Sequence, residues 1–528
     1  MDNQFDVIVI GSGIGGLTSA SLLSKLFGKR VLVLEQHFKP GGFTHIFKRK
    51  DWEWDVGIHY IGQMDSDSLP RKIIDFLTDG NLQWNKMIEP FEEFVYPNFR
   101  FEVHGKKEIY QQTLMEAFPK EKDNISEYFN DIEKMNKWFG YHITWKSLPK
   151  PLDSLPSPLS FSKHALITTK EYLDYRFRDE RLKNLLVSRW GNYGLPPSYS
   201  AFLIHALIDV HYLEGGWYPN GGASMIAKSI LPSIKKNQGD VLLSHRVDKI
   251  LIENQKAIGV EVSLLQGDHV KEKKEFFADM IISNVGAYNT YLRLLPKEKL
   301  DVNLQKELQN IQSELKHFLS HSTSMLSLYL GLKEIPHFTN GRNYWIYRDW
   351  DHDKNFHQRN ELIHGKPQMI YVSFPSIKNP MSVSPTAEII APIDYELFEK
   401  WKTQAWKNRD EDYQNLKNQI AHTLINFANE FIPNFSDIVE YYELATPLSN
   451  EFFSLHPKGI IYGLPCIPQR FKSKYLGPKS FLQNLFLTGA DVGTPGFVGA
   501  MMGGLFAVAA SMGMKNASQL LKTIMKKN

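Results

Sequence analysis

The pattern of apolar positions is clearest in the first 35 residues. Two short apolar runs, FDVIVI at residues 5–10 and VLVL at residues 31–34, have the length and the β-branched content of buried strands. Between them, residues 17–28 (LTSASLLSKLFG) have the apolar spacing of an amphipathic helix. This order of elements predicts a βαβ unit whose two strands are parallel.

The pattern changes along the rest of the chain. Residues 71–190 are mostly helical in pattern, and a proline-rich stretch at residues 148–161 interrupts them. Strand signals return at residues 240–262, around a turn at residues 253–256, and ADMIISNVGA follows as another short buried strand. After a second mixed region the chain ends with the apolar strand NLFLTGAD and a glycine-rich helix.

A glycine-rich turn joins the first predicted strand to the first helix. Gly11, Gly13 and Gly16 form a GxGxxG motif in the strand–turn–helix context that this motif requires, and Gly15 lies in the same turn. The first glycine permits the tight turn, the second lets a pyrophosphate approach the backbone, and the third allows close helix packing. The helix N-terminus offers unpaired N–H groups to phosphates. Together with Glu35 as an acceptor for a ribose diol, the turn predicts dinucleotide binding.

The C-terminal segment favours a flavin over a nicotinamide cofactor. Gly489 and Asp491 follow an apolar strand, and a glycine-rich loop then opens a helix at about residue 497. In glutathione-reductase-type flavoproteins such a segment closes over the ribityl chain and the pyrophosphate, with the aspartate as a hydroxyl acceptor. We therefore predict FAD, with further contacts from Gly496, Phe497 and Val498. The alternative is a glycine-rich helix that packs tightly against its neighbours.

The region between the two ends contains one further candidate cofactor-binding residue and lacks a second dinucleotide-binding motif. Val247 in SHRVDKI is a candidate adenine contact through its backbone, and a plain core valine is the alternative. No second GxGxxG lies at residues 230–300, where a separate NAD(P)H domain would carry one. The electron donor is therefore unknown.

These signals predict an α/β fold with α+β inserts. A Rossmann-like FAD-binding domain of the glutathione-reductase and amine-oxidase type is expected from residues 1–70, 225–300 and 475–528. Residues 71–224 and 301–474 are expected to form an inserted substrate-binding domain.

Composition excludes several classes of function. A net charge of +3 over 528 residues gives no nucleic-acid footprint. Cys466 is the single cysteine, which excludes an intramolecular disulfide and favours a reducing, cytoplasmic location. There is no GxSxG or HExxH motif, and the histidines are scattered, so we predict no metal site. An aromatic share of 13% suits a large apolar ligand, although bulky core packing is the commoner explanation.

Several sequence blocks, spread from residue 6 to about residue 510, resemble one family. They are LEQHFKPGGFTHIF followed by DVGIHYIG, GNYGLPPS with HYLEGGWYPNGG, ISNVGA, and TGADVGTPGFVGAMMGG. Together they resemble the phytoene-desaturase-like flavoproteins, and within these the all-trans-retinol 13,14-reductases. The resemblance implies that Gly41 and Gly42 lie beside the flavin.

The resemblance also gives the segment DWEWDVGIHYIGQM (residues 51–64) a role near the flavin. It implies that His59 and Tyr60 lie on the substrate side, where either is a candidate proton source. We expect Trp52 and Trp54 to form apolar walls of the substrate site. The alternative is a strand with aromatic core residues.

The implied reaction is the saturation of a carbon–carbon double bond in a retinol-like or carotenoid-like isoprenoid. Carotenoid cis-trans isomerases and desaturases share the same motifs, so both reactions stay open. A flavin-bearing lipid-binding protein without turnover is the alternative from another class.

Two segments bear on membrane contact. Residues 137–161 combine Trp, Phe and Tyr with Lys and Pro, which suits a headgroup boundary and predicts peripheral membrane contact. A proline-braced surface loop is the alternative there. Residues 492–514 carry no charge, but their many glycines predict a loop that enters a buried helix rather than a membrane span.

Overall fold

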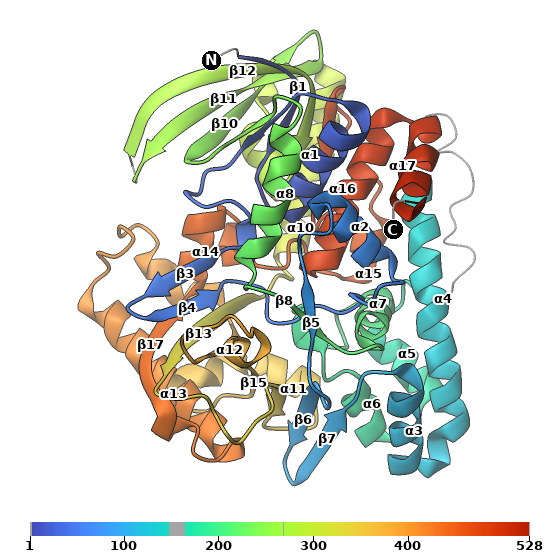
Figure 1. Ribbon diagram of the computed structural model, residues 1–528, viewed down its shortest axis with the longest axis vertical. Helices are drawn as coiled ribbons and strands as arrows, with labels where there is room; N and C mark the ends of the chain where they lie inside the picture. The colour runs from blue at the N-terminus through green and yellow to red at the C-terminus, as the bar shows by residue number, and fades with distance from the viewer. Residues whose placement is uncertain (1–2, 147–163, 268, 527–528) are drawn as a thin grey trace.

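The computed structural model describes residues 3–146, 164–267 and 269–526, and two large β-sheets organise them (Figure 1). Each of these sheets has seven strands within the described residues. The first sheet lies toward the top of Figure 1 and the second toward the bottom, with helices packed around both.

The first sheet contains the predicted βαβ unit. β1 (Gln4–Ile10) and β2 (Val31–Leu34) are parallel neighbours, and α1 (Ile14–Phe27) connects them. The strand order is β10-β11-β12-β1-β2-β9, with β18 (Leu485–Leu487) beside β12. The α/β fold class is therefore confirmed. The remaining strands are β9 (Asp240–Leu242), β10 (His245–Glu253), β11 (Lys256–Gln266) and β12 (His269–Ser283).

Strand β12 is longer than the sequence pattern predicted. We expected a short buried strand within ADMIISNVGA, whereas β12 has 15 residues and begins at His269. Its first half is exposed and pairs with β11, and its last three residues are buried between β1 and β18. The first half of β12 could not be predicted from apolar positions, because its charged residues are held in the sheet by backbone pairing and not by burial.

Two helices rich in small residues pack together beside the first sheet. α16 (Gly496–Met512) lies against α1, and the Ser19 hydroxyl donates to the Gly504 carbonyl at 3.2 Å. A side chain at Gly504 would lie 2.6 Å from the carbonyl oxygen of Gly15, so only glycine permits this approach. The charge-free run at residues 492–514 is thus a loop and a helix, as predicted. None of the described helices has the length and apolar character needed to cross a membrane.

The second sheet has the strand order β17-β13-β16-β15-β14-β6-β7. Its neighbouring strands are antiparallel except β14 and β6, which are parallel. The hairpin of β6 and β7 was not predicted, because the surrounding sequence has a mostly helical pattern. The strands are β6 (Glu92–Tyr96), β7 (Phe99–Val103), β13 (Ser324–Leu332), β14 (Asn343–Tyr347), β15 (Met369–Ser373), β16 (Thr386–Ile393) and β17 (Val439–Ala445).

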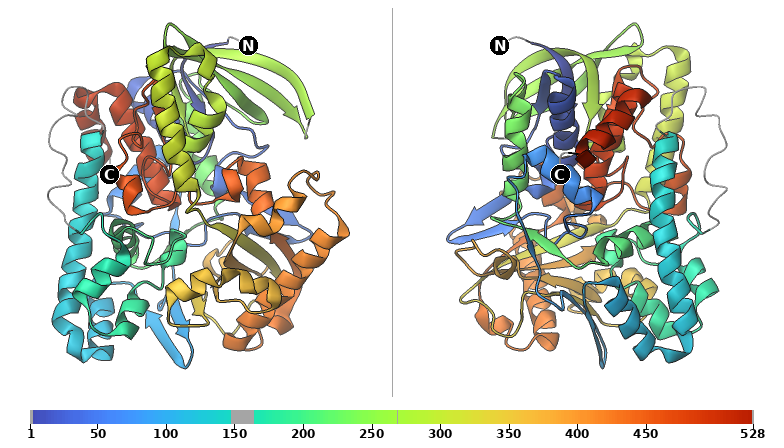
Figure 2. Two further views of the ribbon diagram at one scale, coloured as in Figure 1. Left: turned by 180° about the vertical axis from the view of Figure 1, so that it is seen from behind. Right: turned by 45° about the vertical axis from the view of Figure 1, so that its right-hand side comes forward.

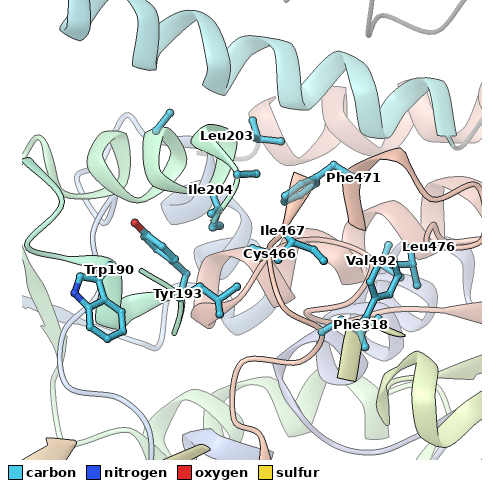
Figure 3. Packing of buried hydrophobic residues seen from close by; sticks show 14 of the residues in the cluster. Trp190, Tyr193, Leu203, Ile204, Phe318, Cys466, Ile467, Phe471, Leu476 and Val492 are labelled. Carbon is cyan, nitrogen blue, oxygen red and sulfur yellow. The ribbon is translucent and has the colours of Figure 1, made fainter. Parts of the chain in front are cut away.

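A helical layer lies beside the second sheet. The long helix α4 (Lys122–Lys146) forms one edge of the molecule, with α7 (Phe202–Tyr212) packed against it (Figure 2). Leu203 of α7 lies near Phe471 in the apolar core that joins this layer to the C-terminal part of the chain (Figure 3). The helical pattern predicted for residues 71–190 is thus largely confirmed.

Shorter elements complete the fold. Two small sheets pair β3 with β4 and β5 with β8. The strands are β3 (Ile46–Arg49), β4 (Trp52–Asp55), β5 (Trp84–Lys86) and β8 (Trp217–Pro219). The other helices are α2 (Leu69–Thr78), α3 (Lys107–Ala117), α5 (Thr169–Arg176), α6 (Glu180–Leu186), α8 (Ser224–Lys235), α9 (Gly286–Asn289), α10 (Val302–Leu319), α11 (His352–His357), α12 (Pro375–Lys378), α13 (Glu411–Phe431), α14 (Pro447–Ser454), α15 (Pro468–Lys472) and α17 (Met514–Lys526).

The two large sheets draw on different parts of the chain. The strands of the first come from residues 4–34, 240–283 and 485–487, and those of the second from residues 92–103 and 324–445. The domain boundaries stated above stay a prediction.

Candidate functional site

One large cavity, of about 1060 Å³, reaches both sheets. Ile10 and Leu34 line it at the carboxyl ends of β1 and β2, and Ser327 and Tyr371 line it on β13 and β15. Ligands of open α/β sheets bind at the carboxyl ends of the strands. The cavity therefore joins a nucleotide position on the first sheet to a second compartment against the second sheet.

The glycine-rich turn forms one end of this cavity. Gly11, Gly13 and Gly15 line it, and Gly11 has a φ of +92°, in the left-handed region that favours glycine. Gly16 does not line the cavity; a side chain there would lie 2.2 Å from the Gly11 carbonyl oxygen, so this glycine lets α1 pack against the turn. No side chain caps the start of α1, and its first N–H groups suit a phosphate.

Glu35 lies at the end of β2, where the sequence predicted a ribose acceptor. Its carboxylate lines the cavity and is held by the protein: Oε2 accepts from the Ser12 N–H at 2.8 Å and from the Ser12 hydroxyl at 2.7 Å. Oε1 accepts from the His37 N–H at 2.8 Å. A carboxylate oxygen has room for a further donor, so Glu35 is oriented and still able to accept from a diol.

Gly41 and Gly42 lie against the phosphate turn. Gly41 pairs with Gly13 in an isolated parallel bridge, and its N–H donates to the Ser12 hydroxyl at 3.0 Å. Both glycines line the cavity and have positive φ angles. Val247 of β10 lines the cavity as well.

The C-terminal segment covers the same end of the cavity. The predicted cofactor residues Gly489, Asp491, Gly496, Phe497 and Val498 all line it. The Asp491 carboxylate accepts from the Leu464 N–H at 2.8 Å and from the Ala287 N–H at 2.7 Å, so it also ties three chain segments together. No side chain caps the start of α16, which leaves a second set of N–H groups at the cavity.

These features fit an FAD molecule. The uncapped starts of α1 and α16 suit its diphosphate, and Glu35 suits its ribose. At Gly496, which begins α16, there is open space where a side chain would stand.

His59 lies farther along the cavity, where its side chain is 16% exposed. Its Nδ1 is 2.6 Å from Oε2 of Glu388, a β16 residue whose side chain is 1% exposed. The Tyr371 ring meets the imidazole edge-on, with ring centroids 5.6 Å apart. The imidazole is thus held between a buried carboxylate and an aromatic ring, within reach of the cavity.

Tyr60 also lines the cavity, but its hydroxyl is engaged. The O–H donates to Oε1 of Glu92 at 2.5 Å, and its ring stacks on Tyr212 with centroids 4.4 Å apart. Glu92 in turn binds the buried Arg189 at 2.7 Å. Burial and the Glu92 charge raise the pKa of Tyr60 well above its ordinary value. The Tyr60 hydroxyl is therefore a fixed hydrogen-bond donor to Glu92 and is poorly suited to donate a proton to a substrate.

Three residues near His59 and Tyr60 were not predicted from the sequence: Glu388, Glu92 and a buried lysine, Lys378. The Lys378 ammonium donates to the His59 carbonyl at 2.9 Å and to the Ser373 hydroxyl at 2.7 Å. Burial lowers the pKa of Lys378 to about 7. A signal for Glu388 did exist, because it interrupts the apolar strand TAEIIAPI. Nothing local links these residues to His59.

The prediction that Trp52 and Trp54 form walls of the substrate site is wrong. Neither tryptophan lines the cavity; both are buried against the second sheet. Trp54 Nε1 donates to the Leu330 carbonyl at 2.9 Å, and the Trp52 ring stacks on Tyr441. The alternative, aromatic core residues on a strand, is correct, because alternate residues of β4 face β13 and β17 rather than the cavity.

The candidate membrane segment is only partly described. Residues 147–161 lie outside the described residues, and residues 137–146 form the end of α4. Phe139 and Gly140 of this helix line the cavity, and Tyr141 is exposed. The end of α4 is therefore one border of the cavity.

The fold and the site define a flavoprotein oxidoreductase of the FAD-dependent class. The sequence pattern of the family described as "Flavin containing amine oxidoreductase" matches residues 14–385, and the chain belongs to this family.

Two relatives agree with this assignment, and a solved structure shares the fold. The chain is 35% identical to an all-trans-retinol 13,14-reductase of Danio rerio over 95% of this chain and 85% of that one. It is 26% identical to prolycopene isomerase 2 of an Oncidium hybrid over 88% of this chain and 76% of that one. A solved oxidoreductase of Methanosarcina mazei has the same fold, with a TM-score of 0.60 at 16% identity over 97% of this chain and 100% of that one.

Proposed function

We propose that this chain saturates a carbon–carbon double bond of an apolar polyene, such as a retinol-like or carotenoid-like isoprenoid. The observation that carries the proposal is the continuity of the cavity. One end is the glycine cradle, formed by the glycine-rich turn at residues 11–16, Gly41, Gly42 and the start of α16. The other end is a compartment lined by Leu207, Ile208, Met325, Met369 and Ile390. A long apolar molecule fits such walls. The similarity to an all-trans-retinol 13,14-reductase supports the same substrate class.

The residues around the second compartment provide a proton and exclude water. Reduced flavin, when bound, supplies the hydride. Of the two candidate proton sources, we assign the role to His59, because Tyr60 already donates its proton to Glu92. Glu388 positions the imidazole at its Nδ1 edge. The apolar walls keep bulk water from competing for the reactive intermediate.

The test is an anaerobic half-reaction. The flavin of the purified protein is reduced, all-trans-retinol or a carotenoid is added, and the flavin absorbance is followed. Reoxidation by the polyene supports the proposal, and a reduced flavin that persists with every polyene contradicts it. A lipid-binding protein without turnover would give this second result.

A cis-trans isomerase is the second candidate, favoured by the similarity to prolycopene isomerase. Such an enzyme changes the geometry of the polyene without a net change in hydrogen content. Product mass separates the two reactions.

We also propose that the substrate enters from a membrane surface at the end of α4, with the protein working at the cytoplasmic side. Phe139 and Gly140 line the cavity there, and Tyr141 is exposed beside them. Co-sedimentation with liposomes tests this contact, and absence of binding contradicts it.

A further inference from the structure

A group of cationic side chains lines one part of the cavity. Arg49 ends β3, Lys407 and Arg409 precede α13, and Lys417 lies on α13. Together these four residues form a cationic wall. Glu443 of β17 lines the cavity beside them and pairs with Arg49 at 2.7 Å. The wall comes from elements that take no part in the glycine cradle.

The charges of the cationic wall are only partly balanced. Among the described residues, no carboxylate lies within ion-pair distance of Lys407, Arg409 or Lys417. The Arg409 guanidinium donates to the Trp401 carbonyl and to the Tyr413 hydroxyl, each at 3.4 Å. The Lys417 ammonium lies 5.6 Å from the Tyr413 ring centroid. Lys407 is exposed, whereas Arg409 and Lys417 are half-buried without an ion pair, and this burial costs free energy that a bound anion would offset.

Arg409 and Lys417 lie close together in the wall. Burial lowers the pKa of Lys417, Glu443 opposes this shift, and Arg409 and Arg49 lower the pKa further. Arg409 and Lys417 share the Tyr413 ring as a neighbour, because the Arg409 guanidinium lies 5.0 Å and the Lys417 ammonium 5.6 Å from its centroid. A phosphate is the kind of multivalent anion that two such cations bind.

Aromatic rings flank the cationic wall. Trp406 lines the same part of the cavity and stacks on Phe452 with ring centroids 5.0 Å apart. The Lys407 ammonium lies 4.5 Å from the Trp406 centroid, and the Phe453 ring lies edge-on to Trp406. Cations beside flat aromatic surfaces suit a ligand that carries both phosphate and a planar base.

We propose that the cationic wall binds the phosphate groups of a free nucleotide, with the base beside Trp406. Arg409 and Lys417 are half-buried within the cavity that also contains the glycine cradle. A soluble nucleotide can enter such a recess, whereas a phosphate fixed in a bilayer surface stays outside it. Soluble hydride donors belong to this ligand class, and the chain has no second GxGxxG motif to bind one. The binding itself is independent of the polyene reaction.

The test uses the FAD-loaded protein and the unreactive probe NADP⁺, with binding followed by titration calorimetry. Lys417→Gln and Arg409→Gln are each expected to raise the Kd at least about tenfold, because each removes a charge-assisted contact. Lys400→Gln is the matched control, because Lys400 is exposed nearby and does not line the cavity. Inorganic phosphate is expected to compete with NADP⁺ on the unaltered protein. Flavin absorbance per protein verifies that each variant retains FAD.

Two results overturn the proposal. The first is absence of NADP⁺ binding, or equal affinity in the two wall variants and the control. The second comes from phosphatidylserine vesicles: if the protein binds these through Arg409 and Lys417 and does not bind NADP⁺, the wall recognises a lipid headgroup.

Discussion

His59 and Glu388 are separated by more than 300 residues, yet Nδ1 of the imidazole lies 2.6 Å from Oε2 of the carboxylate. Glu388 is almost fully buried, whereas His59 lines the cavity. The pair thus connects the core of the second sheet to the compartment in which the polyene is expected to react.

His59→Gln is expected to slow reoxidation of the reduced flavin by the polyene by about 100-fold or more, because a positioned acid contributes on this scale. FAD content should not change, since His59 lies outside the glycine cradle. Stopped-flow absorbance under anaerobic conditions measures the rate. An unchanged rate would remove His59 from the proton-transfer role.

Glu388→Gln keeps the shape of the side chain and removes its charge. We expect a fall of about tenfold in kcat with little change in KM, since an orienting group acts on the chemical step rather than on binding. Steady-state kinetics separate the two parameters. A change confined to KM would indicate that Glu388 shapes the substrate compartment instead.

Tyr60→Phe removes the hydroxyl that donates to Glu92 and keeps the ring that stacks on Tyr212. The flavin reoxidation rate is expected to change by less than about threefold, while the free energy of unfolding falls by about 1–3 kcal/mol because Glu92 loses a buried partner. Denaturant unfolding and the same stopped-flow assay measure both quantities. A loss of rate as large as that of His59→Gln would reverse the assignment of the proton source.

Gly13→Val is expected to abolish FAD binding. A side chain at Gly13 would lie 2.9 Å from Asn284 Nδ2 and would occupy the pyrophosphate approach. Gly28→Ala is the matched control: Gly28 has a positive φ but free space around it, so the variant loses about 1 kcal/mol of stability and keeps its flavin. The ratio of flavin to protein absorbance distinguishes the variants, and a flavin-loaded Gly13→Val protein would contradict the cradle.

Lys378 should give the folded protein a distinct pH dependence. Burial lowers its pKa in the folded state to about 7, so above pH 7 the unfolded chain binds more protons than the folded one. The Lys378 contribution to stability therefore rises with pH from about 7 toward the ordinary lysine pKa. Lys378→Met should lack this rise. Equal slopes of unfolding free energy against pH in both proteins would show that Lys378 keeps its ordinary pKa.

The parts of the structure that were predictable from sequence are local. The turn from Gly11 to Gly16 and the carboxylate of Glu35 lie within one βαβ unit, so spacing alone fixes their geometry. The loop and helix at residues 492–514 were also predictable, because glycine and proline residues interrupt the apolar run.

The features that could not be predicted from the sequence depend on contacts between distant segments. Glu388 and Lys378 reach His59 only because β16 and α12 fold against the segment after β4. The wrong prediction for Trp52 and Trp54 has the same cause. The alternation of side chains along a strand shows that both tryptophans lie on one face, but it does not show which element packs against that face. The long pairing of β12 likewise depends on β11 rather than on its own apolar pattern.

The most direct test of the proposed saturation is the mass of the lipid after a single anaerobic turnover in D₂O. With flavin reduced in advance, the account predicts a product that gains two hydrogens, both as deuterium: one delivered by way of His59 and one from flavin N5, whose hydrogen exchanges with the solvent. A product of unchanged mass with altered double-bond geometry would identify an isomerase and contradict the saturation.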